Sequence, residues 1–76
     1  MNSQDLLDKI ADIMEIDGIL YNQSKLTDFE EWDSLTKLGI ISLFDVQFGV
    51  KLSAEQISNI TYVEDLVKLA QAKLQD

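Results

Sequence analysis

Apolar residues recur at intervals of three and four along most of this chain, and that spacing restricts what it can fold into. Leu6, Ile10 and Ile13 fall on one face of a helix that we expect to run from about Ser3 to Ile16. Strand-type alternation is weak, and no Pro interrupts the helical pattern. The spacing therefore predicts an all-α fold. A chain of 76 residues is long enough for one domain, so we expect residues 1–76 to form a single domain.

Turn signals set the expected ends of the first two helices. Gly18 is expected to stop the first, because Gly takes the left-handed conformation at a helix end without steric cost. The second helix is expected to start at Asp33 or Ser34 and to run to about Phe48, with Gly49 as its stop. Residues 19–32 between them are predicted to form a long loop. Its apolar content indicates that the loop packs along the domain.

Capping-box patterns, in which Ser or Thr is followed three residues later by an acid or amide, open two more helices. The segment Ser53–Gln56 predicts a short third helix that ends near Asn59. The segment Thr61–Glu64 predicts a last helix from about Tyr62 to Gln75. The expected architecture is a four-helix bundle with three longer helices, one short third helix and a long loop between the first two.

Charge and missing residue types exclude several functions. Fourteen acids against six lysines give a net charge of −8, which repels nucleic acids and anionic membranes and favours partners with basic patches. The chain has no His and no Cys, so it holds no Ser-His-Asp triad, thiol nucleophile or zinc–thiolate site. The acidic run from Asp28 to Asp33 does not match a calcium loop. We predict no enzyme activity of its own and no metal site.

The location expected from the sequence is cytoplasmic. No segment is long and apolar enough to span a bilayer, and Met1–Asp5 lacks the basic flank of a signal or transit peptide. We expect a monomer that does not insert into membranes.

The predicted second helix carries apolar residues on two faces. One stripe fits a core-facing side and comprises Ile40, Ile41, Phe44 and Phe48. The other lies roughly opposite and comprises Leu35, Leu38, Leu43 and Val46. A second stripe is either covered by another element or kept for a partner, and we interpret part of it as a docking surface.

The segment Glu31–Leu35 carries the most specific signal. Taken alone, Asp33 is a helix cap and Ser34 is the first residue of the helix. Placed after a long loop and before the central helix of a small acidic domain, Asp-Ser-Leu resembles the motif of the acyl carrier protein family. The resemblance covers nearly the whole chain, since Phe48-Gly49 and Ile60-Thr61 also follow the family pattern. It implies that Ser34 receives 4'-phosphopantetheine from coenzyme A.

The resemblance also implies a role and partners. A phosphopantetheinyl transferase would attach the arm, because no base in this chain is arranged to activate Ser34. The arm's thiol would then hold an acyl or aminoacyl group as a thioester. An acyl-loading ligase or acyltransferase would supply that group, and a ketosynthase or another acyl-transfer enzyme would receive it. Fatty acyl, hydroxyacyl, amino acyl and polyketide cargoes all remain open.

Two further sets of residues follow from the resemblance. The apolar interior beside the second helix would shelter the acyl chain, and the alternative role of these residues is core packing. The candidate lining is Ile41, Phe44, Ile57, Ile60 and Leu66. The candidate partner-recognition residues are Asp33, Leu35, Leu38, Asp45 and Val46.

The chain departs from the fatty-acid carriers along the second helix. Thr36, Gly39 and Val46 stand where those members often carry an acid, and Lys37 adds a positive charge. We interpret this as a specialised carrier for secondary-metabolite, polysaccharide-modifying or aminoacyl-transfer chemistry, with sequence drift in a housekeeping carrier as the alternative. A peptidyl carrier is disfavoured, because such carriers usually place Gly just before the Ser. A helical adaptor that is never modified is the competing class.

Overall fold

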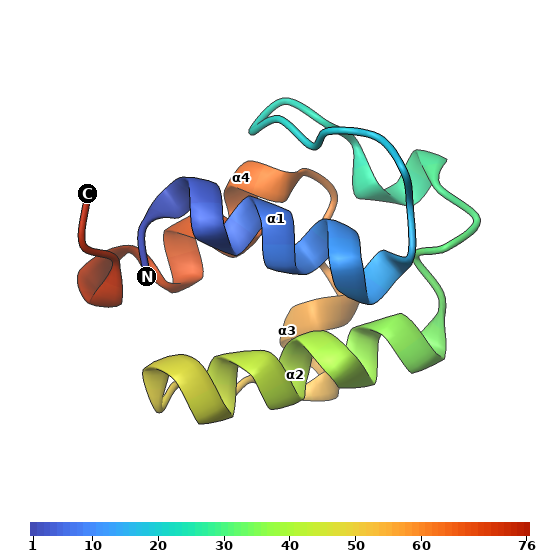
Figure 1. Cartoon of the computed structure of the whole chain (residues 1–76). Helices are drawn as coiled ribbons and strands as arrows, with labels where there is room; N and C mark the ends of the chain where they lie inside the picture. Colours follow the sequence, from blue (N-terminus) through green and yellow to red (C-terminus); the bar gives the residue numbers. More distant parts are fainter.

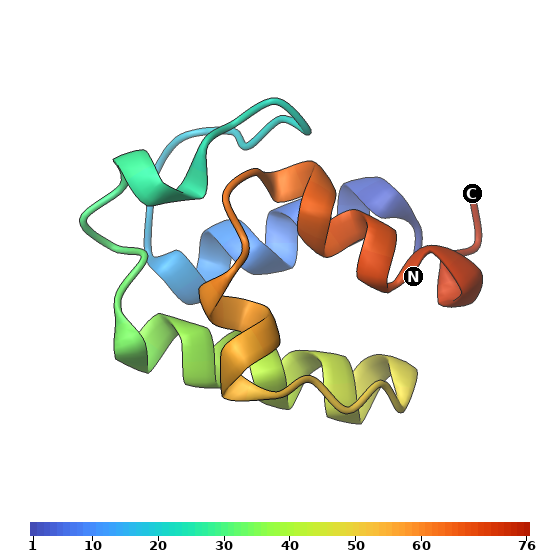
Figure 2. The same ribbon diagram turned by 180° about the vertical axis from the view of Figure 1, so that it is seen from behind.

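The computed structural model describes all 76 residues and is built from helices without a β-strand. Its helices are α1 (Ser3–Met14), α2 (Ser34–Phe48), α3 (Ala54–Ser58) and α4 (Val63–Leu69). Figures 1 and 2 show α1 packed against α2 and α4, with short α3 lying across α2. The predicted all-α class, the short third helix and the long loop between the first two helices are confirmed. None of the helices has the length and apolarity needed to cross a membrane.

A single cluster of seventeen buried apolar residues forms the core. All four helices contribute to it, and so does the loop between α1 and α2. The loop residues Leu20, Leu26 and Trp32 are buried, which confirms that the loop packs along the domain. Ile19 and Tyr21 of the same loop point outward and are 71% and 61% exposed. The cluster consists of Leu6, Leu7, Ile10, Met14, Leu20, Leu26, Trp32, Ile40, Phe44, Phe48, Leu52, Ile57, Ile60, Val63, Leu66, Val67 and Ala70.

The end of α1 differs from the prediction. The left-handed residue is Glu15, with φ 58°, and the helix is complete before Gly18 is reached. The Ile16 N–H donates to the Ala11 carbonyl at 3.2 Å, and the partly buried Ile16 side chain packs against the core. This pairing is that of a Schellman motif, whose apolar contact closes the helix early. Packing of Ile16 therefore outweighs the conformational preference of Gly18.

The loop is tied to the start of α4 by backbone hydrogen bonds. The Leu26 N–H donates to the Thr61 carbonyl at 2.7 Å. In the opposite direction, the Val63 N–H donates to the Ser24 carbonyl at 3.0 Å. A short 3-10 turn over Leu26–Asp28 follows this contact and leads the chain back toward α2. The views in Figures 1 and 2 agree that the loop passes beside the start of α4.

The capping box that opens α3 is present as predicted. The Ser53 hydroxyl accepts from the Gln56 N–H at 3.0 Å, and the Gln56 side chain accepts from the Ser53 N–H at 2.9 Å. At α4 the cap lies one residue later than predicted, and only one of the two hydrogen bonds of a capping box is present. The Asp65 carboxylate accepts from the Tyr62 N–H at 3.0 Å, so Tyr62 and not Thr61 is the cap. A carboxylate at this position satisfies one of the unpaired N–H groups of the helix start.

The last helix is shorter than predicted. α4 ends at Leu69, and a 3-10 turn over Gln71–Lys73 follows, instead of a continuous helix to Gln75. Beyond this turn the backbone is extended, and the Gln75 N–H donates to the Met1 carbonyl at 3.1 Å. Pairing of the C-terminal residues with the N-terminus competes with helix continuation, which the apolar spacing alone does not reveal.

Candidate functional site

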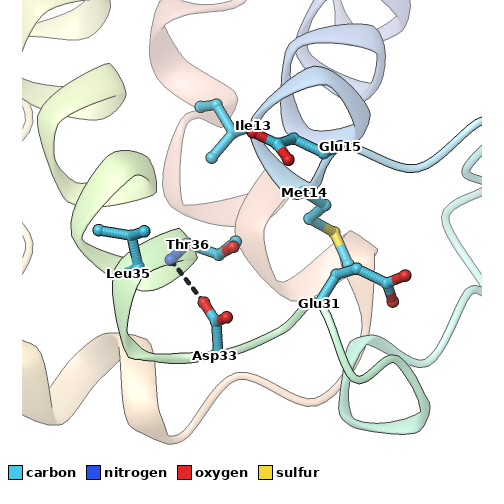
Figure 3. A pocket seen from close by; sticks show the side chains of 7 residues that line it. All are labelled: Ile13, Met14, Glu15, Glu31, Asp33, Leu35 and Thr36. Atoms are coloured by element: carbon cyan, nitrogen blue, oxygen red, sulfur yellow. Dashed lines mark hydrogen bonds between the residues drawn. The ribbon is translucent and has the colours of Figure 1, made fainter.

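Ser34 is the first residue of α2, and its side chain is exposed. Asp33 precedes it as the cap, and its carboxylate accepts from the Thr36 N–H at 2.9 Å (Figure 3). This hydrogen bond lowers the pKa of Asp33 below its usual value of 3.8. The helix start is therefore held by the residue before Ser34, and the Ser34 hydroxyl is left accessible to solvent.

A pocket of about 270 Å³ lies between α2 and α3 and begins at Ser34. It is lined by Ser34, Lys37, Leu38, Ile41, Ala54, Ile57 and Ser58. Two of the predicted acyl-pocket residues, Ile41 and Ile57, therefore line one cavity together with Ser34. The other three, Phe44, Ile60 and Leu66, are buried in the core and do not line it. The pocket offers a mostly apolar surface beside a hydroxyl that a large group could modify.

The sequence does not predict the polar and small side chains that line this pocket. Ala54 and Ser58 come from α3, whose position across α2 is a tertiary feature. Lys37 also lines this pocket, and its ammonium lies 5.8 Å from the centre of the Trp32 ring. This distance is within the range of a cation–π interaction. In the sequence, the only sign of this contact is that Lys37 follows Trp32 by five residues, with the start of α2 between them.

The second apolar stripe of α2 is exposed at three of its four predicted positions. Leu35, Leu38 and Val46 are 78%, 63% and 76% exposed. Leu43 is partly buried and packs against the core, which agrees with only part of the stripe being free for a partner. Asp45 stands beside this stripe and forms an ion pair with Lys51. We refer to Leu35, Leu38 and Val46 as the α2 stripe.

Two of the three positions interpreted as missing acids have a packing role instead. Thr36 is buried, so a carboxylate there would lose its hydration. A Cβ on Gly39 would lie 2.9 Å from Cγ2 of Ile13, so Gly39 marks the close approach of α1 and α2. Only Val46 lies on the exposed surface. Packing therefore disfavours a carboxylate at both Thr36 and Gly39.

A second pocket of about 360 Å³ lies between the end of α1 and the start of α2 (Figure 3). The carboxylates of Glu15, Glu31 and Asp33 line it together with Ile13, Met14, Leu35 and Thr36. No group of acidic side chains in the chain has an arrangement suited to a metal ion. This pocket gathers acidic residues at the start of α2, and Lys37 is not among its lining residues.

Comparisons of the chain with protein-family models, curated proteins and solved structures find no match. Its function has to follow from the site itself. The site consists of an exposed hydroxyl at a capped helix start, an adjoining apolar pocket and an exposed apolar stripe on the same helix.

Proposed function

We propose that this chain is an acyl carrier protein whose Ser34 bears a 4'-phosphopantetheine arm. The observation that carries the proposal is the position of the exposed Ser34 at the start of α2, at the edge of the pocket between α2 and α3. An attached phosphate is compatible with this position, because a helix start presents unpaired N–H groups and the positive end of the helix dipole. The resemblance of Asp33-Ser34-Leu35 to the family motif supports the same role.

The chemistry of attachment needs a second protein. The Ser34 oxygen would form a bond to the phosphorus next to the pantetheine of coenzyme A, and the pyrophosphate bond would break. Adenosine 3',5'-bisphosphate would leave, and the hydroxyl proton would pass to a base of the transferase. The chain has no His or Cys to serve as that base. The arm then supplies the thiol that the chain lacks, and the thiol carries the acyl group in the cytoplasm.

Mass spectrometry tests the proposal directly. The protein is incubated with coenzyme A and a broad-specificity phosphopantetheinyl transferase and is then weighed. We expect a gain of one phosphopantetheine, which Ser34→Ala abolishes. Ser42→Ala is the matched control, because Ser42 is a second exposed serine of α2 and its removal should leave the mass gain unchanged. An unmodified wild-type protein with several transferases would refute the carrier function.

The α2 stripe favours docking of partner enzymes beside the arm. The stripe follows the capping Asp33 on the same helix, a combination that suits a partner surface with an apolar centre and a basic rim. We expect Leu38→Asp to slow thioester transfer by a cognate enzyme. Ile19→Asp is the control, since it places the same charge at an equally exposed apolar position of the loop. Equal transfer rates for both variants would exclude docking through the stripe.

The same stripe is what favours the second candidate, a helical adaptor that binds partner proteins without being modified. The mass measurement separates the two functions. An adaptor would stay unmodified with every transferase and would still lose its partner on Leu38→Asp.

A specialised carrier for secondary-metabolite, polysaccharide-modifying or aminoacyl-transfer chemistry, rather than a housekeeping one, remains our proposal for the pathway. Val46 is the exposed position that still supports it.

A further inference from the structure

Lys37 has an unusual environment for a lysine in this chain. It is half-buried, lines the pocket that begins at Ser34 and forms no ion pair. The ion pair that the structure contains joins Lys51 and Asp45 instead. Partial burial is what sets Lys37 apart, because the other five lysines of the chain are exposed. This environment suits an anion that arrives in the pocket.

In the unmodified protein the Lys37 ammonium lies near the Trp32 ring. The Trp32 ring is only 8% exposed, so its orientation is set by the core, and Lys37 Nζ lies 5.8 Å from the ring centre. Ser34 and Lys37 are three residues apart in α2, and such positions are neighbours on a helix surface, with Cβ atoms about 5–6 Å apart. Ser34 and Lys37 line the same pocket, so a group attached to Ser34 enters the surroundings of the Lys37 side chain.

We propose that Lys37 pairs with the phosphate attached to Ser34 and directs the arm toward the pocket between α2 and α3. This inference rests on the carrier function proposed above. The phosphate would be bonded directly to the Ser34 oxygen, so it is the one group of the arm that must stay within reach of Lys37. Asp33 forms no ion pair with Lys37, and one of its carboxylate oxygens accepts from the Thr36 N–H.

An ion pair between Lys37 and the phosphate would offset the negative charge of the domain. A phosphodiester added to a domain with a net charge of −8 meets a repulsive field, and Glu31 and Asp33 lie in the adjoining pocket. A partly buried cation next to the phosphate is screened less by salt than an exposed one. Lys37 thereby offsets part of this repulsion at the pocket between α2 and α3.

Phosphorus NMR on the modified protein tests the pair. Wild type, Lys37→Gln, Lys37→Arg and Lys68→Gln are each converted by a transferase, and complete conversion is confirmed by mass. We expect Lys37→Gln to shift the phosphodiester resonance toward that of the same modified protein unfolded in urea, in which no cation is held beside the diester. Lys37→Arg should restore the wild-type position. Lys68→Gln removes the same charge from an exposed position on α4 and should leave the resonance unchanged.

Fluorescence gives a second readout, because Trp32 is the only tryptophan of the chain. Attachment of the arm should draw the ammonium away from the ring and change the Trp32 emission in wild type, but not in Lys37→Gln. Full mass gain with identical phosphorus resonances in wild type and Lys37→Gln would overturn the pair and leave the carrier function intact. Absence of any mass gain would overturn both.

Discussion

Gly39 allows the contact between α1 and α2 to be tested quantitatively. In an exposed helix, Gly39→Ala would stabilise the protein by about 1 kcal/mol, because Ala is the better helix former. Here the new methyl would lie 2.9 Å from Ile13 Cγ2, and overpacking of this kind costs about 1–3 kcal/mol. We therefore expect a net loss of about 0–2 kcal/mol. For a domain of this size each kcal/mol lowers the melting temperature by about 4–8 °C.

The sign of the effect should reverse when the opposing methyl is removed. In an Ile13→Ala background the clash is absent, so Gly39→Ala should raise the free energy of unfolding by about 1 kcal/mol. Urea unfolding of the four proteins in this cycle should give a coupling of about 1–3 kcal/mol. Gly18→Ala is the control, because nothing lies within 4 Å of its Cβ position, and it should show no coupling to Ile13. Equal effects of Gly39→Ala in both backgrounds would refute the close approach.

Three further predictions concern the helix ends. The Thr36 N–H holds the pKa of Asp33 below 3.8, so the charged cap stabilises the fold fully above that pH and loses its effect as the pH falls through the lowered pKa. The difference in urea midpoint between wild type and Asp33→Asn should therefore shrink at acidic pH, and a pH-independent difference would contradict this. Glu15 and Gly49 both have left-handed backbones, with φ 58° and φ 66°. Glu15→Gly should therefore raise the free energy of unfolding by about 1 kcal/mol, and Gly49→Ala should lower it by about 1 kcal/mol. Changes of the same sign would be inconsistent with these conformations. Ser53→Ala should cost about 1 kcal/mol in thermal unfolding, while Ser53→Asp should retain most of the cap, so equal losses would argue against a capping role.

Where both ends of a helix carry strong local signals, the sequence predicts its bounds well. α2 begins after the acceptor side chain of Asp33 and ends before Gly49, as expected. α1 and α4 end earlier than expected because interactions between distant parts of the chain decide those ends. At α1 this is the packing of Ile16 on the core, and at α4 it is the hydrogen bond between Gln75 and Met1.

In the candidate site, too, local sequence determines some features and contacts between distant residues determine others. The exposure of Ser34 follows from its place at a helix start, which local sequence determines. The lining of the pocket does not, since apolar spacing marks Ile41 and Phe44 alike as inward-facing. Only the position of α3 across α2 leaves Ile41 beside the cavity and Phe44 in the core. Periodicity identifies the buried side of a helix but not the gaps that remain beside it.

The hydrogen bonds between the loop and α4 have a consequence for how this chain reaches its structure. Leu26 and Thr61, like Ser24 and Val63, lie on the order of 40 residues apart in the chain, so their pairing closes a long stretch at an entropic cost. The helices themselves need only nearby residues. The amide protons of Leu26 and Val63 consequently report on docking of the two halves rather than on helix formation, and their exchange with solvent follows the opening of the loop that leads to Ser34.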